Sequence, residues 1–325
     1  MSDTDLVHGG ALDGMARAFP NAPAPWLDLS TGINPWPYRV AVEDRDWSRL
    51  PSAALHAACR DAMARAWGAQ PAAVLPVPGT ELAIRLLPSL VEAREVAVIG
   101  PTYDDHAKAW RAAGRRVREV VAPSDAPGAD VLVLCNPNNP DGRVFDAETL
   151  AALRGRARWL VVDEAYADVA PGVSLAADAG TPGLVVLRSF GKFYGLAGVR
   201  LGAVLGPPDL LARLAALLGH WGVSGPALRL GAAAYADAAW REGTLARLRA
   251  ASADLSERLA AGGLEVVGGT PLFTLARADD AAERWRRLAE AGVYVRRFAR
   301  DPALLRFGLP PSGADADRLS AALSP

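Results

Sequence analysis

Hydrophobic and polar positions follow two arrangements along the chain, and the change falls near residue 207. From residue 52 to about 206, short apolar runs alternate with segments whose apolar residues recur at helical spacing. The expected helices are Ala53–Trp67, Glu81–Glu92, Asp105–Ala113 and Glu148–Arg154, and the expected strands are Val74–Val77, Val96–Ile99, Val117–Val121, Val131–Leu134, Trp159–Val162, Leu184–Leu187 and Leu201–Leu205. This alternation predicts an α/β fold with a mainly parallel central sheet and helices on both faces.

The remaining segments predict a smaller α+β domain and an N-terminal arm. The expected helices after residue 207 are Asp209–Leu218, Pro226–Ala261, Ala281–Glu290 and Ala314–Leu323, and the expected strands are Leu264–Val267, Leu272–Leu275, Tyr294–Arg296 and Leu304–Gly308. Residues 1–40 are rich in Gly, Pro and Trp, which predicts an irregular arm without a helix, packed on the C-terminal domain or over the site. We therefore expect an arm at 1–44, a large domain at 45–210 and a small domain at 211–325.

Composition excludes several classes of protein. The formal net charge of the 325 residues is -1, so no general attraction to nucleic acid or to a membrane is expected. No apolar run approaches the length of a membrane span, and the acidic start does not resemble a signal peptide. The two cysteines, Cys59 and Cys135, form no CxxC pair, which is typical of a reducing cytosol. We expect a cytoplasmic protein without a metal site.

The stretch from Ser189 to Gly202 places a lysine among small and apolar residues. Lys192 lies three residues after Ser189 and eight before Arg200, and the chain has only one other lysine, Lys108. Burial and a neighbouring cation both disfavour the ammonium form, so Lys192 is a candidate nucleophile for an aldehyde. A hydroxyl and a guanidinium nearby are suited to a phosphate. An aldehyde that carries a phosphate is pyridoxal 5'-phosphate (PLP), the expected cofactor.

A second candidate is the apolar strand that ends in Asp163. Ligands of open α/β sheets bind at the carboxyl ends of strands. A carboxylate there can pair with a protonated pyridine nitrogen, and the phenol of Tyr166 can reach a ring hydroxyl. The alternative is an Asp163 that caps a helix and a Tyr166 that packs in the core.

Three further segments also follow predicted strands. Asn139, in the run Asn136–Gly142, can donate to a ring oxygen, and Tyr103 can stack on a planar ring. Gly79 and Thr80 open a helix whose unpaired N–H groups can bind phosphate. Each has an ordinary alternative: a Pro/Asn/Gly turn, a loop aromatic, and a βα turn capped by a threonine.

In this order, the segments resemble the fold-type I PLP enzymes of the aspartate aminotransferase superfamily over nearly the whole chain. The resemblance implies that Lys192 binds the cofactor aldehyde and Asp163 the pyridine nitrogen, and that these enzymes are usually homodimers with the site at the subunit interface. It implies a cofactor-binding set of Gly79, Thr80, Glu81, Tyr103, Asn139, Asp163, Tyr166, Ser189, Lys192 and Arg200, with Lys192, Asp163 and Tyr166 catalytic.

The arm is similar to that of the threonine-phosphate decarboxylases of cobalamin biosynthesis. His8-Gly9-Gly10 and the segment Asp28–Pro35 carry this similarity, which implies that His8 and Gly9 contact a substrate phosphate with Asn34 close by. A lone histidine near a chain end is otherwise most often a tail residue.

The implied reaction is decarboxylation of L-threonine O-3-phosphate to (R)-1-aminopropan-2-yl phosphate. The alternatives are an aminotransferase of the histidinol-phosphate type and, more remotely, a PLP-binding regulatory protein. Regulators of that kind usually append a DNA-binding module, and the arm contains no basic helix pair.

Two arginines near the C-terminus complete the expected substrate site. The resemblance implies that Arg306 binds the substrate carboxylate and Arg296 its phosphate, with Arg297 as the rival of Arg296 and solvated strand-edge arginines as the alternative. Relatives often carry a tyrosine where this chain has Leu50, and that tyrosine reaches the cofactor phosphate of the partner subunit. We expect that contact to be missing or replaced, with Tyr38 as the candidate.

Overall fold

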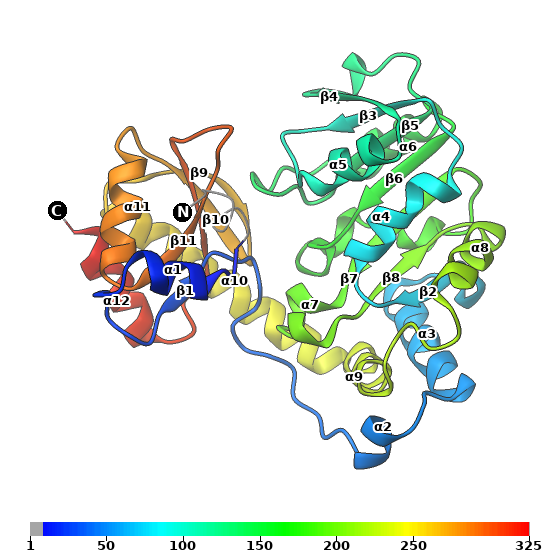
Figure 1. Cartoon of the computed structure of the whole chain (residues 1–325), viewed down its shortest axis with the longest axis horizontal. Helices are drawn as coiled ribbons and strands as arrows, with labels where there is room; N and C mark the ends of the chain where they lie inside the picture. The colour runs from blue at the N-terminus through cyan, green and yellow to red at the C-terminus, as the bar shows by residue number, and fades with distance from the viewer. Residues whose placement is uncertain (1–8, 325) are drawn as a thin grey trace. The chain divides into compact units, whose positions relative to one another are not determined.

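The computed structural model describes residues 9–324, and these divide into two compact units (Figure 1). One unit is Pro37–Glu242; the other joins the residues up to Trp36 with those from Gly243 onward. The domain limits that the sequence predicts, at 44/45 and 210/211, differ from the bounds of these two units. Those limits stay a prediction. The chain passes from one unit to the other inside one long helix, α10 (Ala238–Ala261).

The large unit is built on a seven-stranded sheet. The strands in spatial order are β2 (Val74–Val77), β8 (Gly202–Leu205), β7 (Leu184–Ser189), β6 (Trp159–Asp163), β5 (Val131–Cys135), β3 (Glu95–Ile99) and β4 (Arg116–Val120). All neighbours pair in parallel except β8, which is antiparallel to both β2 and β7. The predicted α/β fold with a mainly parallel sheet is therefore confirmed, with one reversed strand that the apolar pattern did not reveal.

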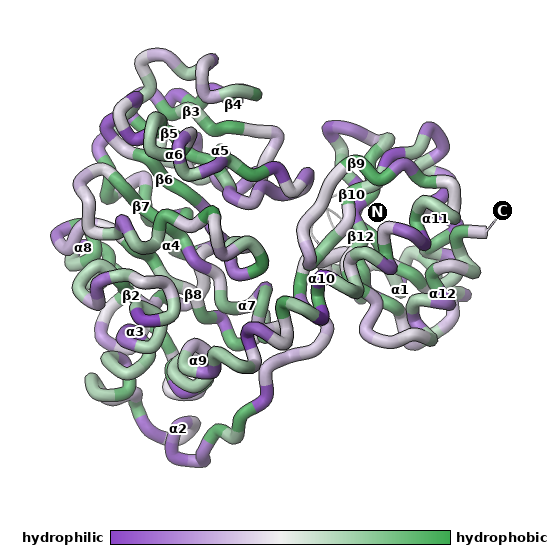
Figure 2. The backbone as a smooth tube through the Cα atoms, turned by 180° about the vertical axis from the view of Figure 1, so that it is seen from behind, coloured by the Kyte–Doolittle hydropathy of each residue, from purple (hydrophilic) through white to green (hydrophobic). Residues whose placement is uncertain are grey.

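Helices cover this sheet and bury its apolar side chains. The helices of the large unit are α2 (Asp44–Ser48), α3 (Ala53–Trp67), α4 (Thr80–Leu90), α5 (Asp105–Ala112), α6 (Ala147–Arg154), α7 (Phe190–Phe193), α8 (Pro208–Leu218) and α9 (Gly225–Ala236). Alternate strand residues such as Val131 and Val133 join one core cluster with α4, α5 and α8, while α6 packs on β6 and buries Leu150. In Figure 2 the central strands β6 and β7 are coloured mainly hydrophobic, as expected of buried parallel strands.

The small unit contains a five-stranded sheet. Its order is β1 (Leu27–Leu29), β11 (Val293–Arg297), β12 (Leu304–Gly308), β10 (Phe273–Arg277) and β9 (Glu265–Thr270), and its helices are α1 (Leu12–Ala18), α11 (Ala281–Glu290) and α12 (Gly313–Leu323). Strand β1 comes from the arm and pairs in parallel with β11. The described part of the arm thus packs with the C-terminal residues, one of the two placements we expected.

Two local predictions are wrong. The arm contains the helix α1, because Met15 becomes completely buried and this tertiary contact outweighs the surrounding glycines and prolines. The single helix expected at Pro226–Ala261 is two helices, α9 and α10, separated at Asp237. The Asp237 side chain accepts a hydrogen bond of 2.9 Å from the N–H of Trp240 and so stabilises the start of α10.

Candidate active site

The lysine segment leaves the end of β7 and returns as β8. Ser189 is the last residue of β7 and lies opposite Gly202, and the short helix α7 between them carries Lys192. Lys192 is half-buried, with Gly191 and Phe193 buried on either side. A Cβ on Gly191 would lie 2.8 Å from Cα of Ala197, so only glycine permits this close packing.

The predicted phosphate ligands meet at the start of α4. Gly79 has a φ of 83° and precedes the first turn, whose N–H groups receive no side-chain cap. A Cβ on Gly79 would lie 2.8 Å from Nη2 of Arg200, and a Cβ on Gly202 would lie 3.1 Å from the N of Thr80. The glycines therefore let a helix N-terminus, Arg200 and the Ser189 region come together. Free N–H groups, the helix dipole and a guanidinium fit a phosphate.

Asp163 is held rigidly at the end of β6. The residue is 5% exposed; Oδ1 accepts a hydrogen bond of 3.0 Å from the N of Ala165, and Oδ2 lies 2.8 Å from Nε2 of His106. Burial lowers the pKa of His106, but its interactions with Asp163 and Cys135 outweigh burial and raise that pKa to about 10. A buried carboxylate fixed on both oxygens suits a protonated pyridine nitrogen.

His106 is a site residue that the sequence analysis missed. It lies on α5 three residues after Tyr103, and the rings of the two residues contact edge to face at 6.1 Å. Tyr103 precedes α5, so no helical spacing links the two residues, and the sequence offered no local signal for His106.

Asp163 belongs to a cluster of three side chains whose residue types can bind a metal ion. The ligand atoms of His106, Cys135 and Asp163 lie within 4.8 Å of one another, and all three residues are buried. The hydrogen bond between His106 and Asp163 accounts for this grouping, and the absence of a metal site stays a prediction. Cys59 and Cys135 are both free.

Tyr103 is tethered by Glu81. The Tyr103 hydroxyl donates a hydrogen bond of 3.0 Å to Oε2 of Glu81, and Glu81 forms an ion pair of 2.7 Å with Arg85. Burial and the carboxylates of Asp105 and Glu81 raise the pKa of Tyr103. The Glu81 side chain therefore orients an aromatic ring, and only its N–H remains in the first turn of α4 for a phosphate.

The loop after β5 contains three asparagines that differ in burial. The Asn136 amide donates to the carbonyls of Phe145 and Val173, and the Asn138 amide donates to the carbonyl of Pro101 and to Asp141. Both side chains are buried, whereas Asn139 is half-buried. Tyr166 is buried just beyond β6. Of the three asparagines, Asn139 is therefore best placed to serve a ligand.

In the small unit, two arginines lie opposite each other on neighbouring strands. Arg296 of β11 and Arg306 of β12 are register partners, so their side chains share one face of the sheet. Arg297 is exposed and its guanidinium stacks on Trp285 at 4.3 Å. Strand alternation thus separates the rivals: Arg296 lies on the face of Arg306, and Arg297 on the other face.

The described arm residues gather around Ser30. The N–H of Gly10 donates to the Ser30 hydroxyl at 2.8 Å, and Arg306 donates to the Ser30 carbonyl at 2.9 Å. A Cβ on Gly9 would lie 2.7 Å from the same carbonyl oxygen, so the backbone approach requires glycine. Asn34 is buried and accepts a hydrogen bond of 2.9 Å from the N of Trp36. His8 lies outside the described residues.

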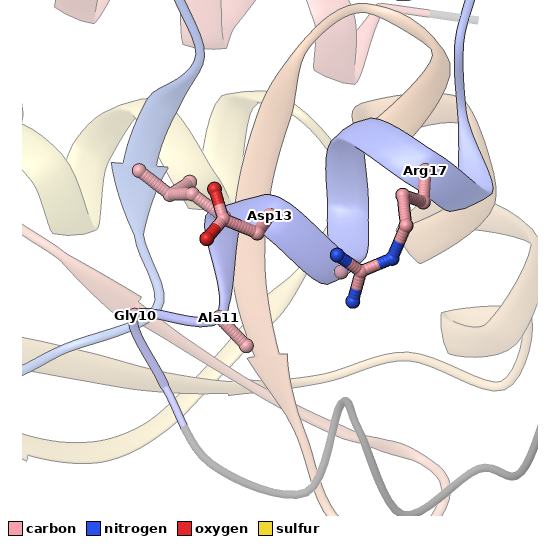
Figure 3. A pocket seen from close by; sticks show the side chains of 6 residues that line it. Gly10, Ala11, Asp13 and Arg17 are labelled. Atoms are coloured by element: carbon pink, nitrogen blue, oxygen red, sulfur yellow. The ribbon is translucent and has the colours of Figure 1, made fainter.

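An open hollow of about 260 Å³ lies along the start of α1 (Figure 3). Its lining residues run from Gly10 to Arg17, and Figure 3 places Asp13 and Arg17 on successive turns of the helix. None of the predicted site residues within 9–324 lines it.

Tyr38, the candidate for the hydroxyl that Leu50 lacks, has contacts within its own unit. Tyr38 is buried, its hydroxyl donates to Asp237 at 3.4 Å, and its ring packs on Tyr194 and Trp240. Leu50 is largely exposed. The replacement of the missing contact by Tyr38 stays a prediction.

Known proteins are similar to this chain in sequence and in fold over most of its length. The sequence profile of the family "Aminotransferase class I and II" matches residues 26–323. A threonine-phosphate decarboxylase of Pseudomonas aeruginosa is 44% identical over 98% of this chain and 97% of its own length. A histidinol-phosphate aminotransferase of Mycobacterium bovis is 36% identical over 90% of this chain and 80% of its own. The solved histidinol-phosphate aminotransferase of Sinorhizobium meliloti, in complex with pyridoxal-5'-phosphate, is 20% identical and superposes with a TM-score of 0.79 over 96% of this chain and 92% of its own.

No described helix is long and apolar enough to cross a membrane.

Proposed function

Because the chain belongs to the class I and II aminotransferase family, we propose that it is a PLP-dependent threonine-phosphate decarboxylase. The observation that carries the proposal is the 44% identity to a threonine-phosphate decarboxylase, which extends over 98% of this chain and 97% of the relative. The match leaves no domain of either protein unaccounted for. It agrees with the superfamily, the cofactor and the reaction that the sequence predicted.

The residues of the large unit fit PLP from end to end. Gly79, Thr80, Ser189 and Arg200 would hold its phosphate, and the lack of a Cβ at Gly79 leaves space beside the Arg200 guanidinium. Asn139 and Tyr166 would donate to the ring oxygen, and Tyr103 would stack on the ring. When bound, PLP supplies an electron sink for the pair of electrons that the departing CO2 leaves behind.

Asp163 and His106 keep the pyridine end charged. The carboxylate of Asp163 would accept the ring N–H, and its contacts with His106 and the Ala165 N–H keep it from rotating away. Because the site is buried, this charge pairing is screened little by water.

Lys192 has two tasks in succession. Its Nζ would hold the aldehyde of bound PLP, and it would be a free amine once the substrate amine is bound there instead. That amine would donate a proton to the substrate carbon from which CO2 departs, so that one C–C bond breaks and one C–H bond forms.

Arg306 and Arg296 select the substrate. Threonine phosphate carries a carboxylate and a phosphate, and each arginine offers a planar pair of donors to one of these groups. Gly9, Asn34 and His8 complete the phosphate ligands. By holding the carboxylate, Arg306 would orient the substrate and so decide which of its bonds breaks. The product is (R)-1-aminopropan-2-yl phosphate, for the cobalamin nucleotide loop.

The test is a pair of assays on the PLP-loaded protein. With L-threonine O-3-phosphate alone, we expect release of CO2 and formation of the phosphorylated amine in equal amounts. With histidinol phosphate and 2-oxoglutarate, we expect little glutamate. Fast glutamate formation without CO2 release would overturn the proposal in favour of the aminotransferase, which the 36% identity to a histidinol-phosphate aminotransferase keeps as the second candidate.

We also propose a cytoplasmic homodimer with the active site at the subunit interface. The free, buried cysteines suit a reducing compartment. Trp47, Leu50, Leu217 and Trp221 are large apolar residues that are each more than half exposed, and such residues are typical of interfaces. Two of them, Trp47 and Leu50, lie close in the chain to Asp46 of α2, which pairs with Arg229 of α9 at 3.0 Å. Sedimentation equilibrium should give a mass near 68 kDa, twice the 34.1 kDa of one chain; a monomer mass would exclude the dimer.

A further inference from the structure

Arg188 is a buried cation beside the candidate active site to which no role has yet been given. It lies on β7 with a side chain that is 3% exposed. Nη1 bonds Oε2 of Glu164 at 2.9 Å, Nη2 bonds Oδ1 of Asp168, and the guanidinium lies over the ring of Trp67 at 4.9 Å. The Glu164 side chain is fully buried and that of Asp168 is 9% exposed.

The three charged residues sit next to the three predicted catalytic residues in the sequence. Glu164 directly follows Asp163, Asp168 lies two residues after Tyr166, and Arg188 lies four residues before Lys192. The first two pairs belong to the end of β6 and the turn after it, and the third to the end of β7. One guanidinium therefore links the segments that carry Asp163, Tyr166 and Lys192.

The link is reinforced on the Glu164 side. Oε1 of Glu164 accepts a hydrogen bond of 2.6 Å from the N of Leu175, and Oε2 accepts one from the Ser174 hydroxyl. The backbone N–H of Glu164 also donates to the carbonyl of Leu187 at 2.8 Å. Arg188 thus fixes not only two strand ends but also the loop that packs behind them.

Stability alone is a poor explanation for this cluster. A buried ion pair often stabilises a fold no more than apolar residues of the same volume, because both charges must leave water. Burial raises the pKa of Glu164 even though Arg188 and Ser174 oppose it, which shows how far the carboxylate depends on its partners. Two carboxylates around one guanidinium do, however, allow only one arrangement of the segments that carry them.

We propose that Arg188 is a positioning residue for the decarboxylation, and that its contacts with Glu164 and Asp168 hold Asp163, Tyr166 and Lys192 in the arrangement that binds PLP productively. This inference rests on the proposed function for its substrate. It does not rest on that function for its effect on the cofactor.

The test compares Arg188→Lys with Asp168→Asn and with a control. Lysine keeps the charge but cannot donate to both carboxylates in one plane. Asp168→Asn removes one ion pair and leaves the contact between Arg188 and Glu164 in place. The control is Arg154→Lys, at an Arg–Asp pair of 3.2 Å between Arg154 and Asp178 in the same unit. Four quantities are measured: the melting temperature of the apoprotein, its dissociation constant for PLP, the pH midpoint of the absorbance change of the bound cofactor, and kcat and KM for threonine phosphate.

For Arg188→Lys we expect PLP to bind at least about 10-fold more weakly, the pH midpoint to move, and kcat to fall at least about 10-fold with KM within about 3-fold, the scale of misplaced catalytic groups. Asp168→Asn should give smaller changes in the same direction, and Arg154→Lys none. If Arg188→Lys does not fold, Asp168→Asn decides alone.

A lower melting temperature with unchanged PLP affinity, pH midpoint and kcat would overturn the proposal, because the cluster would then be merely structural. Unchanged values of all four quantities would overturn it as well. If the wild-type protein releases no CO2 from threonine phosphate, the decarboxylase proposal fails, whereas the PLP affinity and the pH midpoint still test Arg188.

Discussion

The two sheets of this molecule present their functional side chains in different ways. In the large sheet the candidate residues lie at the carboxyl ends of parallel strands, as Asp163 ends β6 and Ser189 ends β7. In the small sheet Arg296 and Arg306 lie within antiparallel strands and meet through their register. The first arrangement places backbone turns and a helix end where a cofactor can bind. The second offers charged side chains from one face of a sheet. We infer that cofactor binding and substrate selection are separable by mutation.

Loss of the lysine should have the largest effect. Lys192→Ala should abolish the absorbance band of the lysine-bound cofactor and lower kcat by more than about 100-fold, since both a nucleophile and a proton donor are removed. Absorbance spectra and CO2 release measure this. Survival of the band would refute the central assignment in the large sheet.

Removal of the paired arginine should damage substrate binding and spare the cofactor. Arg306→Gln should raise KM for threonine phosphate about 10- to 100-fold, the worth of a charge-assisted hydrogen bond, while PLP binds as in the wild type. Arg297→Gln, on the opposite face, is the matched control and should change neither quantity more than about 2-fold. Equal effects of the two variants would break the contrast between the faces.

A pH-dependent effect should distinguish His106. Its pKa is raised to about 10 in the folded state, against about 6.5 in an unfolded chain. Its pairing with Asp163 therefore stabilises the apoprotein fully below about pH 6.5, and this contribution is lost as the pH rises toward 10. The difference in urea-unfolding free energy between wild type and His106→Asn should shrink over that range. A difference that does not vary with pH would argue against a charged His106.

The smallest effect is expected at the tether of Tyr103. Glu81→Gln should weaken PLP binding only about 2- to 3-fold, because a carboxylate side chain that is 33% exposed gains little from its partners. Tyr103→Phe keeps the ring but removes the same hydrogen bond, so equilibrium dialysis should give a similar value. A much larger loss in Glu81→Gln alone would place its carboxylate against the cofactor itself.

The same contrast explains what the sequence could predict. An apolar run followed by a polar residue identifies a strand end, so Asp163 and Asn139 could be selected before the structure was known. Lys192 could be selected as a lysine among small and apolar residues between Ser189 and Arg200. The choice between Arg296 and Arg297 required the register of β11 against β12, which no local pattern contains. His106 and Arg188 were missed because a single His in a helix and a single Arg in a strand resemble ordinary core or surface residues. The break at Asp237 carries no Gly or Pro, and the helix α1 depends on burial of Met15.

The reversed strand β8 fixes where the chain segment that carries Lys192 begins and ends. Because Ser189 and Gly202 are opposite each other, the chain between them leaves and returns at one point of the sheet. Lys192 and Arg200 belong to that closed segment, and in the proposed function they serve the two ends of one small molecule, its aldehyde and its phosphate. One inserted residue would add up to about 3.5 Å of chain. The number of residues in this segment thus limits the length of a ligand that Lys192 and Arg200 can both contact. Homologues with a longer segment should accept a different cofactor geometry or none.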